Sequence, residues 1–136
     1  MMKFEGLYDI RDANNEDVAF ITSTFLRGIY YGDSWFSLIP KDIFMVHYKP
    51  IIEMLLAKSV IKIACPKDDP SIIMGYSILS ADYLTIHYVY VKKQFRLFGI
   101  ARSLLPKYPE QITHLTELGR KLMNKFESVI FNPFNI

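Results

Sequence analysis

Apolar residues recur along this chain with two different periods, and together these periods predict ten elements. Val18, Ile21, Phe25 and Ile29 lie three or four positions apart, which is the spacing of one buried helix face. Short runs rich in β-branched and aromatic residues indicate strands between residues 60 and 91. We expect strands at 7–13, 60–65, 72–79, 83–91, 112–116 and 129–131, and helices from 18, from 40 towards 56, over 99–105 and over 117–126.

Proline and glycine residues place several of the boundaries between these elements. Pro40 suits the first turn of the second helix. Pro50 should kink or divide that helix, because proline removes one backbone hydrogen bond and clashes with the preceding turn. The first helix should end at Gly28, Gly32 and Asp33, in a loop that carries the aromatic residues Tyr30, Tyr31, Trp35 and Phe36.

The resulting order, β-α-α-β-β-β-α-β-α-β, predicts a mixed α/β (α+β) fold in one domain over residues 1–136. Apolar residues make up 51% of the chain, which suffices for a core, and the formal net charge of +2 is too small to indicate a nucleic-acid or membrane partner. One local basic cluster suggests a single anionic ligand; its members are Lys92, Lys93, Arg96 and Arg102.

The remaining composition excludes several classes of site. Cys65 is the sole cysteine, so we expect a buried thiol and no internal disulfide, and no Cys/His cluster has the spacing of a metal site. The first 15 residues lack the apolar segment of a signal peptide, and no apolar run reaches the ~18 residues of a membrane span. We therefore expect a cytoplasmic protein without a metal ion.

Residues suited to binding a phosphate are concentrated where the strand ending at Val91 passes through a basic loop into a helix. Gly99 opens that helix, and a residue without a Cβ lets the backbone approach a ligand closely. The first turn of a helix offers unpaired N–H groups and the positive end of the helix dipole, which together favour phosphate. Arg96 and Arg102 could add charge-assisted hydrogen bonds, while the small Ala101 leaves the approach open.

Arg96-x-x-Gly99-x-Ala101 resembles the (Arg/Gln)-x-x-Gly-x-(Gly/Ala) signature of the GNAT acetyltransferases. The resemblance covers residues 85–105 and, in the order of elements, most of the chain; the long N-terminal half also resembles small bacteriophage-encoded members. It implies a mostly antiparallel sheet flanked by helices, acetyl-CoA as cofactor, and acyl transfer to an amine. The cofactor-binding residues that it implies are Val89, Tyr90, Val91, Arg96, Leu97, Phe98, Gly99, Ile100, Ala101 and Arg102.

The chain departs from the family pattern at the catalytic positions. Many members carry a glutamate as general base two residues before the Val89-x-Val91 pattern, and here that position holds His87. Histidine can do the same work, or this one only bonds a neighbour. The helical tyrosine that protonates the leaving thiolate in many members corresponds to Met123; Tyr108 is a substitute for it, or else only packs.

Tyr31, Trp35 and Phe36 lie where the family's variable acceptor-binding segment lies, and their alternative role is aromatic packing in the core. The acceptor is a small-molecule or macromolecular amine of unknown identity, a nucleobase included if the phage resemblance holds. The family's last strand pair is cut short, so the sheet is smaller or a second chain in a homodimer completes it. The alternative function is a binding or structural protein that kept the fold and lost the chemistry.

Overall fold

The computed structural model describes residues 7–32, 35–96, 99–126 and 128–136, and in it six strands form one sheet in chain order. The first four strands pair antiparallel, β5 pairs parallel with β4, and β6 pairs parallel with β5. The strands are β1 (Tyr8–Asp12), β2 (Val60–Pro66), β3 (Gly75–Leu79), β4 (Thr85–Val91), β5 (Gln111–Ile112) and β6 (Ile130–Phe131). The α-helices are α1 (Val18–Gly32), α2 (Lys41–Lys58), α3 (Ile100–Leu104) and α4 (Glu117–Lys125), and short 3₁₀ turns lie at Asn15–Asp17, Phe36–Leu38 and Lys93–Phe95. The mixed, mostly antiparallel sheet and the order of ten elements are as predicted.

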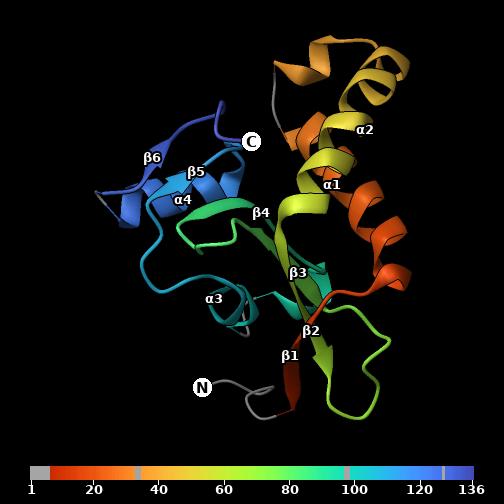
Figure 1. Cartoon of the computed structure of the whole chain (residues 1–136), viewed down its shortest axis with the longest axis vertical. Helices are drawn as coiled ribbons and strands as arrows, with labels where there is room; N and C mark the ends of the chain where they lie inside the picture. The colour runs from red at the N-terminus through yellow and green to blue at the C-terminus, as the bar shows by residue number, and fades with distance from the viewer. Residues whose placement is uncertain (1–6, 33–34, 97–98, 127) are drawn as a thin grey trace.

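Helices cover both faces of this sheet, as Figure 1 shows. On one face, α1 and α2 pack against β2, β3 and β4; Phe25, Ile52 and Tyr76 lie in this cluster and are fully buried. On the other face, α3 packs through Ile100 and Leu104, and α4 packs through Leu122. The sheet therefore has a core on each side.

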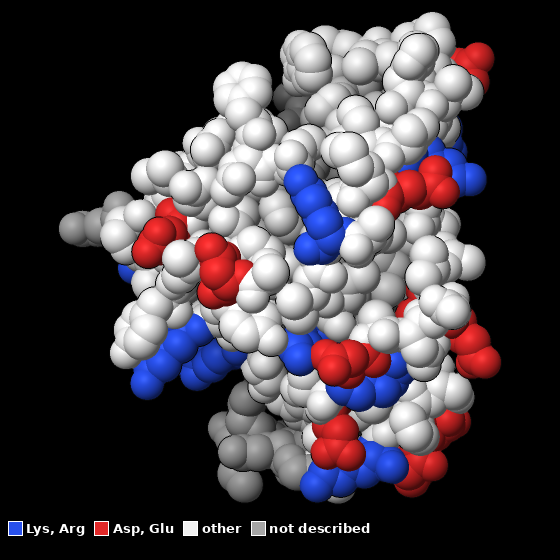
Figure 2. Space-filling model, viewed as in Figure 1, with Lys and Arg blue, Asp and Glu red and all other residues white. Residues whose placement is uncertain are grey.

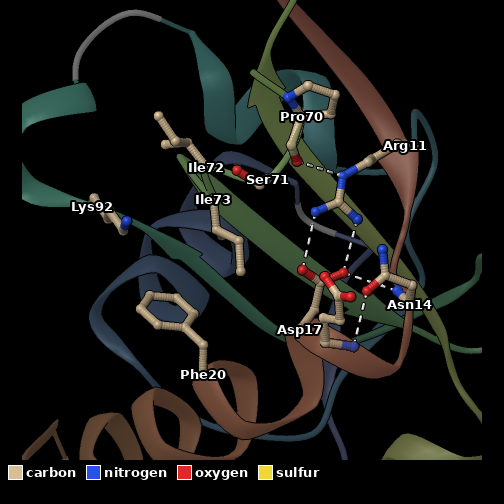
Figure 3. Close-up of a pocket in the computed structure, with 10 residues that line it drawn as sticks. Arg11, Asn14, Asp17, Phe20, Pro70, Ser71, Ile72, Ile73 and Lys92 are labelled. Carbon is tan, nitrogen blue, oxygen red and sulfur yellow. Dashed lines mark hydrogen bonds and ion pairs between the residues drawn. The ribbon is translucent and has the colours of Figure 1, made fainter.

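A buried ion pair fixes the junction between β1 and α1. The Arg11 guanidinium donates to both carboxylate oxygens of Asp17, at 2.8 and 3.0 Å, and its Nε donates to the Pro70 carbonyl at 3.0 Å. Asp17 also accepts from the backbone N–H of Asn14, and the Asn14 side chain accepts from Glu16 N–H, which closes a capping box. Figure 3 shows this network at one wall of a hollow.

The structure corrects several of the predicted boundaries. Tyr30 and Tyr31 lie inside α1 rather than in a loop, since Tyr30 is buried and its hydroxyl donates to the Ile39 carbonyl at 2.7 Å. Helix α2 continues through Pro50 to Lys58, so the proline does not divide it. Strand β4 begins two residues later than expected because Tyr83 takes a positive φ of 62° in the preceding turn.

Candidate cofactor and acceptor site

A cleft of about 580 Å³ runs along β4 between α1, α3 and α4. Of the ten cofactor-binding residues predicted from the sequence, seven line it. These are Val89, Tyr90, Val91, Arg96, Gly99, Ile100 and Ala101. Arg102 is exposed on α3 and is not part of the lining, and Leu97 and Phe98 lie outside the described residues.

A bulge in β4 sets the direction of the backbone in this cleft. Ile78 pairs with Tyr88, but the next residue of β3, Leu79, pairs with Ile86. One step on β3 therefore spans two on β4, and His87 is the additional residue. The carbonyls of Ile86 and His87, consecutive residues, both accept hydrogen bonds from the β5 side.

Beyond the bulge, Val89 and Val91 of β4 point their backbone N–H and C=O groups away from β3, towards the other edge of the strand. The Lys92 N–H donates to the Met74 carbonyl next to β3 at 2.9 Å. Because backbone direction alternates along an antiparallel strand, Tyr90 also faces β3, and Val89 and Val91 face the opposite edge. That edge is the cleft, so it offers strand-type donors and acceptors to an extended ligand.

Strand β5 pairs with only the first part of β4, and this opens the cleft. Thr113 N–H donates to the Ile86 carbonyl at 3.2 Å. At the next residue the contact to β4 comes from a side chain instead of the backbone: Nδ1 of His114 lies 3.1 Å from the His87 carbonyl oxygen. The chain then turns into α4, whose N-cap Thr116 accepts from Gly119 N–H and lines the cleft.

The start of α3 forms the far end of the cleft. Gly99 is the N-cap with φ of 79°, a left-handed conformation that side chains rarely adopt. Nε of Arg96 donates to the Val91 carbonyl at 3.0 Å, which folds this side chain onto the end of β4. A guanidinium has five N–H donors, so that bond engages one of them and holds the cation beside the cleft.

Sequence reasoning missed the cleft residues that other elements contribute. Gly28 and Gly32 come from α1, and Glu117 and Lys121 come from the first turns of α4. Tyr88 also lines the cleft; its ring stacks on Phe25 at 4.4 Å, and burial raises the pKa of its phenol to about 12. Two glycines four positions apart on one helix are a signal that could have marked α1 as a close neighbour.

His87 lies beside the cleft rather than in its lining. The side chain is buried, with 5% of its surface exposed, and lines a cavity of about 10 Å³ that shares Tyr88, Val89 and Thr116 with the cleft. Burial lowers the pKa of His87 to about 4, with a smaller contribution from the positive charge of Lys58. Its role as general base stays a prediction.

The bulge interrupts the alternation of side chains along β4 at His87. Ile86 and Val89 pack in the same cluster beside α4, although strict alternation would put residues three positions apart on opposite faces. The strand therefore changes phase at His87, and the sequence pattern alone does not say which way this side chain points.

The other predicted catalytic and acceptor residues lie outside the described cleft. Tyr108 is 75% exposed and lines a separate hollow with Leu84 and Leu105. Tyr31 and Trp35 are exposed near the end of α1, while Phe36 packs on Phe44 and Tyr48. Their roles stay predictions.

The residues of the predicted basic cluster do not all lie at one site. Lys92 lies over the Phe20 ring, 5.1 Å from its centroid, and lines the hollow beside Arg11 and Asp17 (Figure 3). Positive and negative side chains are interspersed over the face of the molecule in Figure 2, with wide uncharged areas between them. Near the cleft, the described cations are Arg96 and Lys121.

Three further expectations concern the cysteine, a metal site and a membrane span. Cys65 is a buried free thiol, as predicted, with Sγ 3.8 Å from the Asp9 carbonyl oxygen. Within the described part of the chain, no three His, Cys, Asp or Glu side chains group as they would around a metal ion. None of the helices described is both long and apolar enough to cross a bilayer.

Comparisons with known proteins bear on the fold. No protein-family model matches the chain, and a search of curated proteins finds no match. Among solved structures, an acetyl transferase from Pyrococcus furiosus superposes with TM-score 0.58 at 18% identity, over 90% of this chain and 79% of that one.

Two further solved structures carry more specific descriptions. A GCN5-related N-acetyltransferase from Rhodopseudomonas palustris gives TM-score 0.52 at 15% identity, over 76% and 62% of the two chains. The ribosomal-protein-alanine N-acetyltransferase of Brucella melitensis gives 0.50 at 18%, over 87% and 89%. At such identities the likeness concerns the fold alone, and the chain has the fold of the GNAT acetyltransferases.

Proposed function

We propose that this protein is an acyl-CoA-dependent N-acyltransferase that transfers an acetyl group from acetyl-CoA to an amine. The observation that carries the proposal is the cleft beside β4. It combines the outward-facing backbone of Val89 and Val91 with the glycine-led start of α3. A flexible amide-containing chain with a phosphate at one end matches that combination.

The residues present fit such a ligand along the length of the cleft. The backbone N–H and C=O groups of Val89 and the N–H of Val91 would pair with the amides of the pantetheine arm, as an added strand pairs with a sheet edge. The backbone around Gly99 would approach the pyrophosphate closely, and Arg96 and Lys121 would supply positive charge. Acetyl-CoA, when bound, supplies the activated thioester.

The chain's own contribution to the reaction is orientation and electrostatic stabilisation. A backbone N–H that points from β4 into the cleft would donate to the thioester oxygen as negative charge develops on it, a contribution of about 3 kcal/mol in enzymes that use such donors. The Tyr88 phenol is protonated at neutral pH, and burial raises its pKa further, to about 12, so it can act as a donor in the cleft wall.

Cofactor binding is the first test. Acetyl-CoA at ~100 times its dissociation constant should raise the free energy of unfolding by about 2.7 kcal/mol, seen as a higher Tm. A Tm unchanged by millimolar acetyl-CoA or CoA would contradict the proposal. Release of free CoA thiol in a screen of amines then separates a transferase from a binding protein, which would bind without releasing thiol.

A further inference from the structure

Four polar side chains form a continuous hydrogen-bonded chain from α2 to β4. The Tyr48 hydroxyl lies 2.7 Å from Nε2 of His114, and Nδ1 of His114 lies 3.0 Å from Oγ1 of Thr113. The same Thr113 oxygen lies 3.0 Å from Nδ1 of His87. Both imidazoles and the threonine are buried, whereas Tyr48 is half-buried. Such a chain can be satisfied only if each proton takes a defined place.

The backbone carbonyl of His87 decides the tautomer of His114. A carbonyl oxygen only accepts, and it lies 3.1 Å from Nδ1 of His114, so a neutral His114 carries its proton on Nδ1. Nε2 is then bare, and it accepts from the Tyr48 hydroxyl at 2.7 Å. A hydroxyl donating to an imidazole that a third group orients is the arrangement by which enzymes activate a hydroxyl.

The same logic extends through Thr113 to the bulge. Because His114 donates from Nδ1, the Thr113 hydroxyl proton has Nδ1 of His87 as its acceptor at 3.0 Å. His87 then carries its own proton on Nε2 and is a hydrogen-bond donor at rest. Each imidazole therefore has one bare nitrogen that accepts from a hydroxyl: Nε2 of His114 accepts from Tyr48, and Nδ1 of His87 accepts from Thr113.

Tyr48 packs against the segment that follows α1 in the chain. Its ring packs on Phe36, one of the predicted acceptor residues, at 5.3 Å between centroids, and stacks on Phe44 at 5.1 Å. His114 lines the small cavity that adjoins the cleft at Tyr88 and Val89. The pair thus links the segment after α1 with the point where β5 leaves β4.

We propose that Tyr48 and His114 form the proton-accepting pair of this transferase, with Tyr48 contacting the acceptor amine and His114 acting through it. This inference rests on the proposed N-acyltransferase function. The Tyr48 oxygen takes a proton from the attacking amine while its own proton passes to Nε2 of His114. The amine lone pair forms the new C–N bond, the C–S bond breaks, and the sulfur leaves with the electron pair of the broken C–S bond. His114 then returns its proton through Tyr48 to the thiolate, so that amine and thioester become amide and thiol.

The surroundings of Tyr48 and His114 keep Nε2 of His114 unprotonated at neutral pH, which is the state that can accept a proton. Besides the hydrogen bonds already described, the charge of Lys58 from α2 acts on His87, and the His87 imidazole acts on His114. Burial lowers the pKa of His114 to about 4, opposed by its bond to the His87 carbonyl, so Nε2 stays bare at neutral pH. With pKa values of about 4 both imidazoles are weak bases, so a proton passes to the pair only from an amine nitrogen that has attacked and become far more acidic than the free amine.

The tautomers can be measured without turnover. Long-range ¹⁵N–¹H spectra of ¹⁵N-histidine-labelled protein should show Nδ1–H for His114 and Nε2–H for His87, unchanged from pH 5.5 to pH 8. Tyr48→Phe should shift the His114 Nε2 resonance and leave His87 unaffected. An Nε2–H tautomer for His114, or titration of His114 near pH 6.5, would overturn the proposal.

Kinetics test the role of the pair. Tyr48→Phe keeps the ring stacked on Phe44, and with an amine acceptor its kcat should fall about 100-fold while the Kd for CoA stays as in wild type. His114→Gln should behave alike. Transfer to hydroxylamine, a weaker base whose attacking nitrogen loses its proton more readily, should fall much less. His47→Gln, at an exposed histidine on the same helix, is the matched control and should keep full kcat.

The outcomes separate this inference from the function on which it rests. Full kcat in a folded Tyr48→Phe variant that binds CoA would overturn the proton-accepting pair and leave the transferase intact. Wild type that binds CoA but transfers acetyl to neither amines nor hydroxylamine would overturn the transferase itself, and the pair with it. An equal loss of turnover with both acceptors would also overturn the pair, because it would indicate a structural role.

Discussion

The Tyr88 hydroxyl of β4 occupies the space beside the Cα of Gly28 on α1, where a side chain would otherwise lie. A Cβ on residue 28 would overlap the Tyr88 oxygen and lie 2.9 Å from Cζ. Both residues line the cleft. The closeness of α1 to β4 at this point thus depends on the absence of one carbon atom, and the position of the Tyr88 phenol depends on it as well.

Gly28→Ala should therefore displace either Tyr88 or α1. We expect a loss of about 1–3 kcal/mol in the free energy of unfolding, typical of overpacking, together with weaker binding of CoA. Gly32→Ala is the matched control, since Gly32 lies on the same helix and in the same cleft but has nothing within 4 Å of its Cβ position. Chemical denaturation of both variants checks this, and equal stability would contradict the steric explanation.

Much of the fold followed from local pattern. The long helices α1 and α2 and the antiparallel strands β2–β4 have strong periodicity, and the sequence analysis found each of them to within a few residues. The end of α1 was misjudged because Tyr30 reads as a loop aromatic in sequence. Its burial against Phe44 and its bond to Ile39 are tertiary contacts that no local pattern reports.

The site was predictable only where it is contiguous in sequence. The segment 89–101 supplies half of the cleft, and a strand–loop–helix pattern with a glycine indicated it. Gly28, Glu117 and Lys121 come from elements that reach the cleft by packing. The partnership of Tyr48 with His114, 66 residues apart, depends on the packing of α2, and the bulge at His87 depends on the register between strands; the sequence pattern determines neither.

The left-handed backbone at Gly99 gives a second prediction. Gly99→Val should cost about 1–2 kcal/mol of stability, because a side chain at φ of 79° is strained, and should also remove the rise in Tm that CoA produces. The strain acts on the start of α3 and not on the core. Thermal shifts with and without CoA separate the two effects, and a folded Gly99→Val variant with a normal shift would contradict the cofactor role.

Arg96 and Arg102 were both predicted to bind the cofactor, and the structure distinguishes them. Arg96 lines the cleft and is anchored on the Val91 carbonyl, whereas Arg102 is exposed outside it. Arg96→Ala should weaken CoA binding roughly tenfold, with a smaller effect on pantetheine, which lacks the phosphates. Arg102→Ala should have less effect on either ligand. Calorimetric titration decides, and equal losses of CoA and pantetheine binding for Arg96→Ala would show that this residue acts through packing.

The ion pair between Arg11 and Asp17 should be the strongest polar contribution to stability at the β1–α1 junction. Asp17 is buried, and Asp17→Asn should cost about 2–3 kcal/mol because the Arg11 charge loses its partner. Asp12→Asn removes the partner of Lys62, but Asp12 is 77% exposed, so that variant should lose less than about 0.5 kcal/mol. Denaturation at pH 7 compares the two, and similar losses would contradict the difference in burial.

The two buried imidazoles predict how stability depends on pH. The pKa values of His87 and His114 are both lowered to about 4 in the folded protein, mainly by burial, from an ordinary value of 6.5. Below pH 6.5 the unfolded chain therefore binds protons that the folded chain does not, and the free energy of unfolding falls as the pH falls towards 4. Asp17 acts in a lower window: the Arg11 hydrogen bond lowers the pKa of its carboxyl, so its contribution is lost below about pH 4.

Between pH 6 and pH 5 the two histidines together should reduce the free energy of unfolding by about 2 kcal/mol, since each contributes a slope approaching 1.4 kcal/mol per pH unit. His114→Gln should lower stability at pH 7, because Tyr48 loses its acceptor, but should halve the slope. His47→Gln, at an exposed position on α2, should keep the wild-type slope. Urea denaturation at half-unit intervals from pH 7 to pH 5 measures all three proteins. A wild-type curve that is flat over this range would show that the imidazoles take up protons in the folded state. The proton arrangement from Tyr48 to His87 would then be wrong as well.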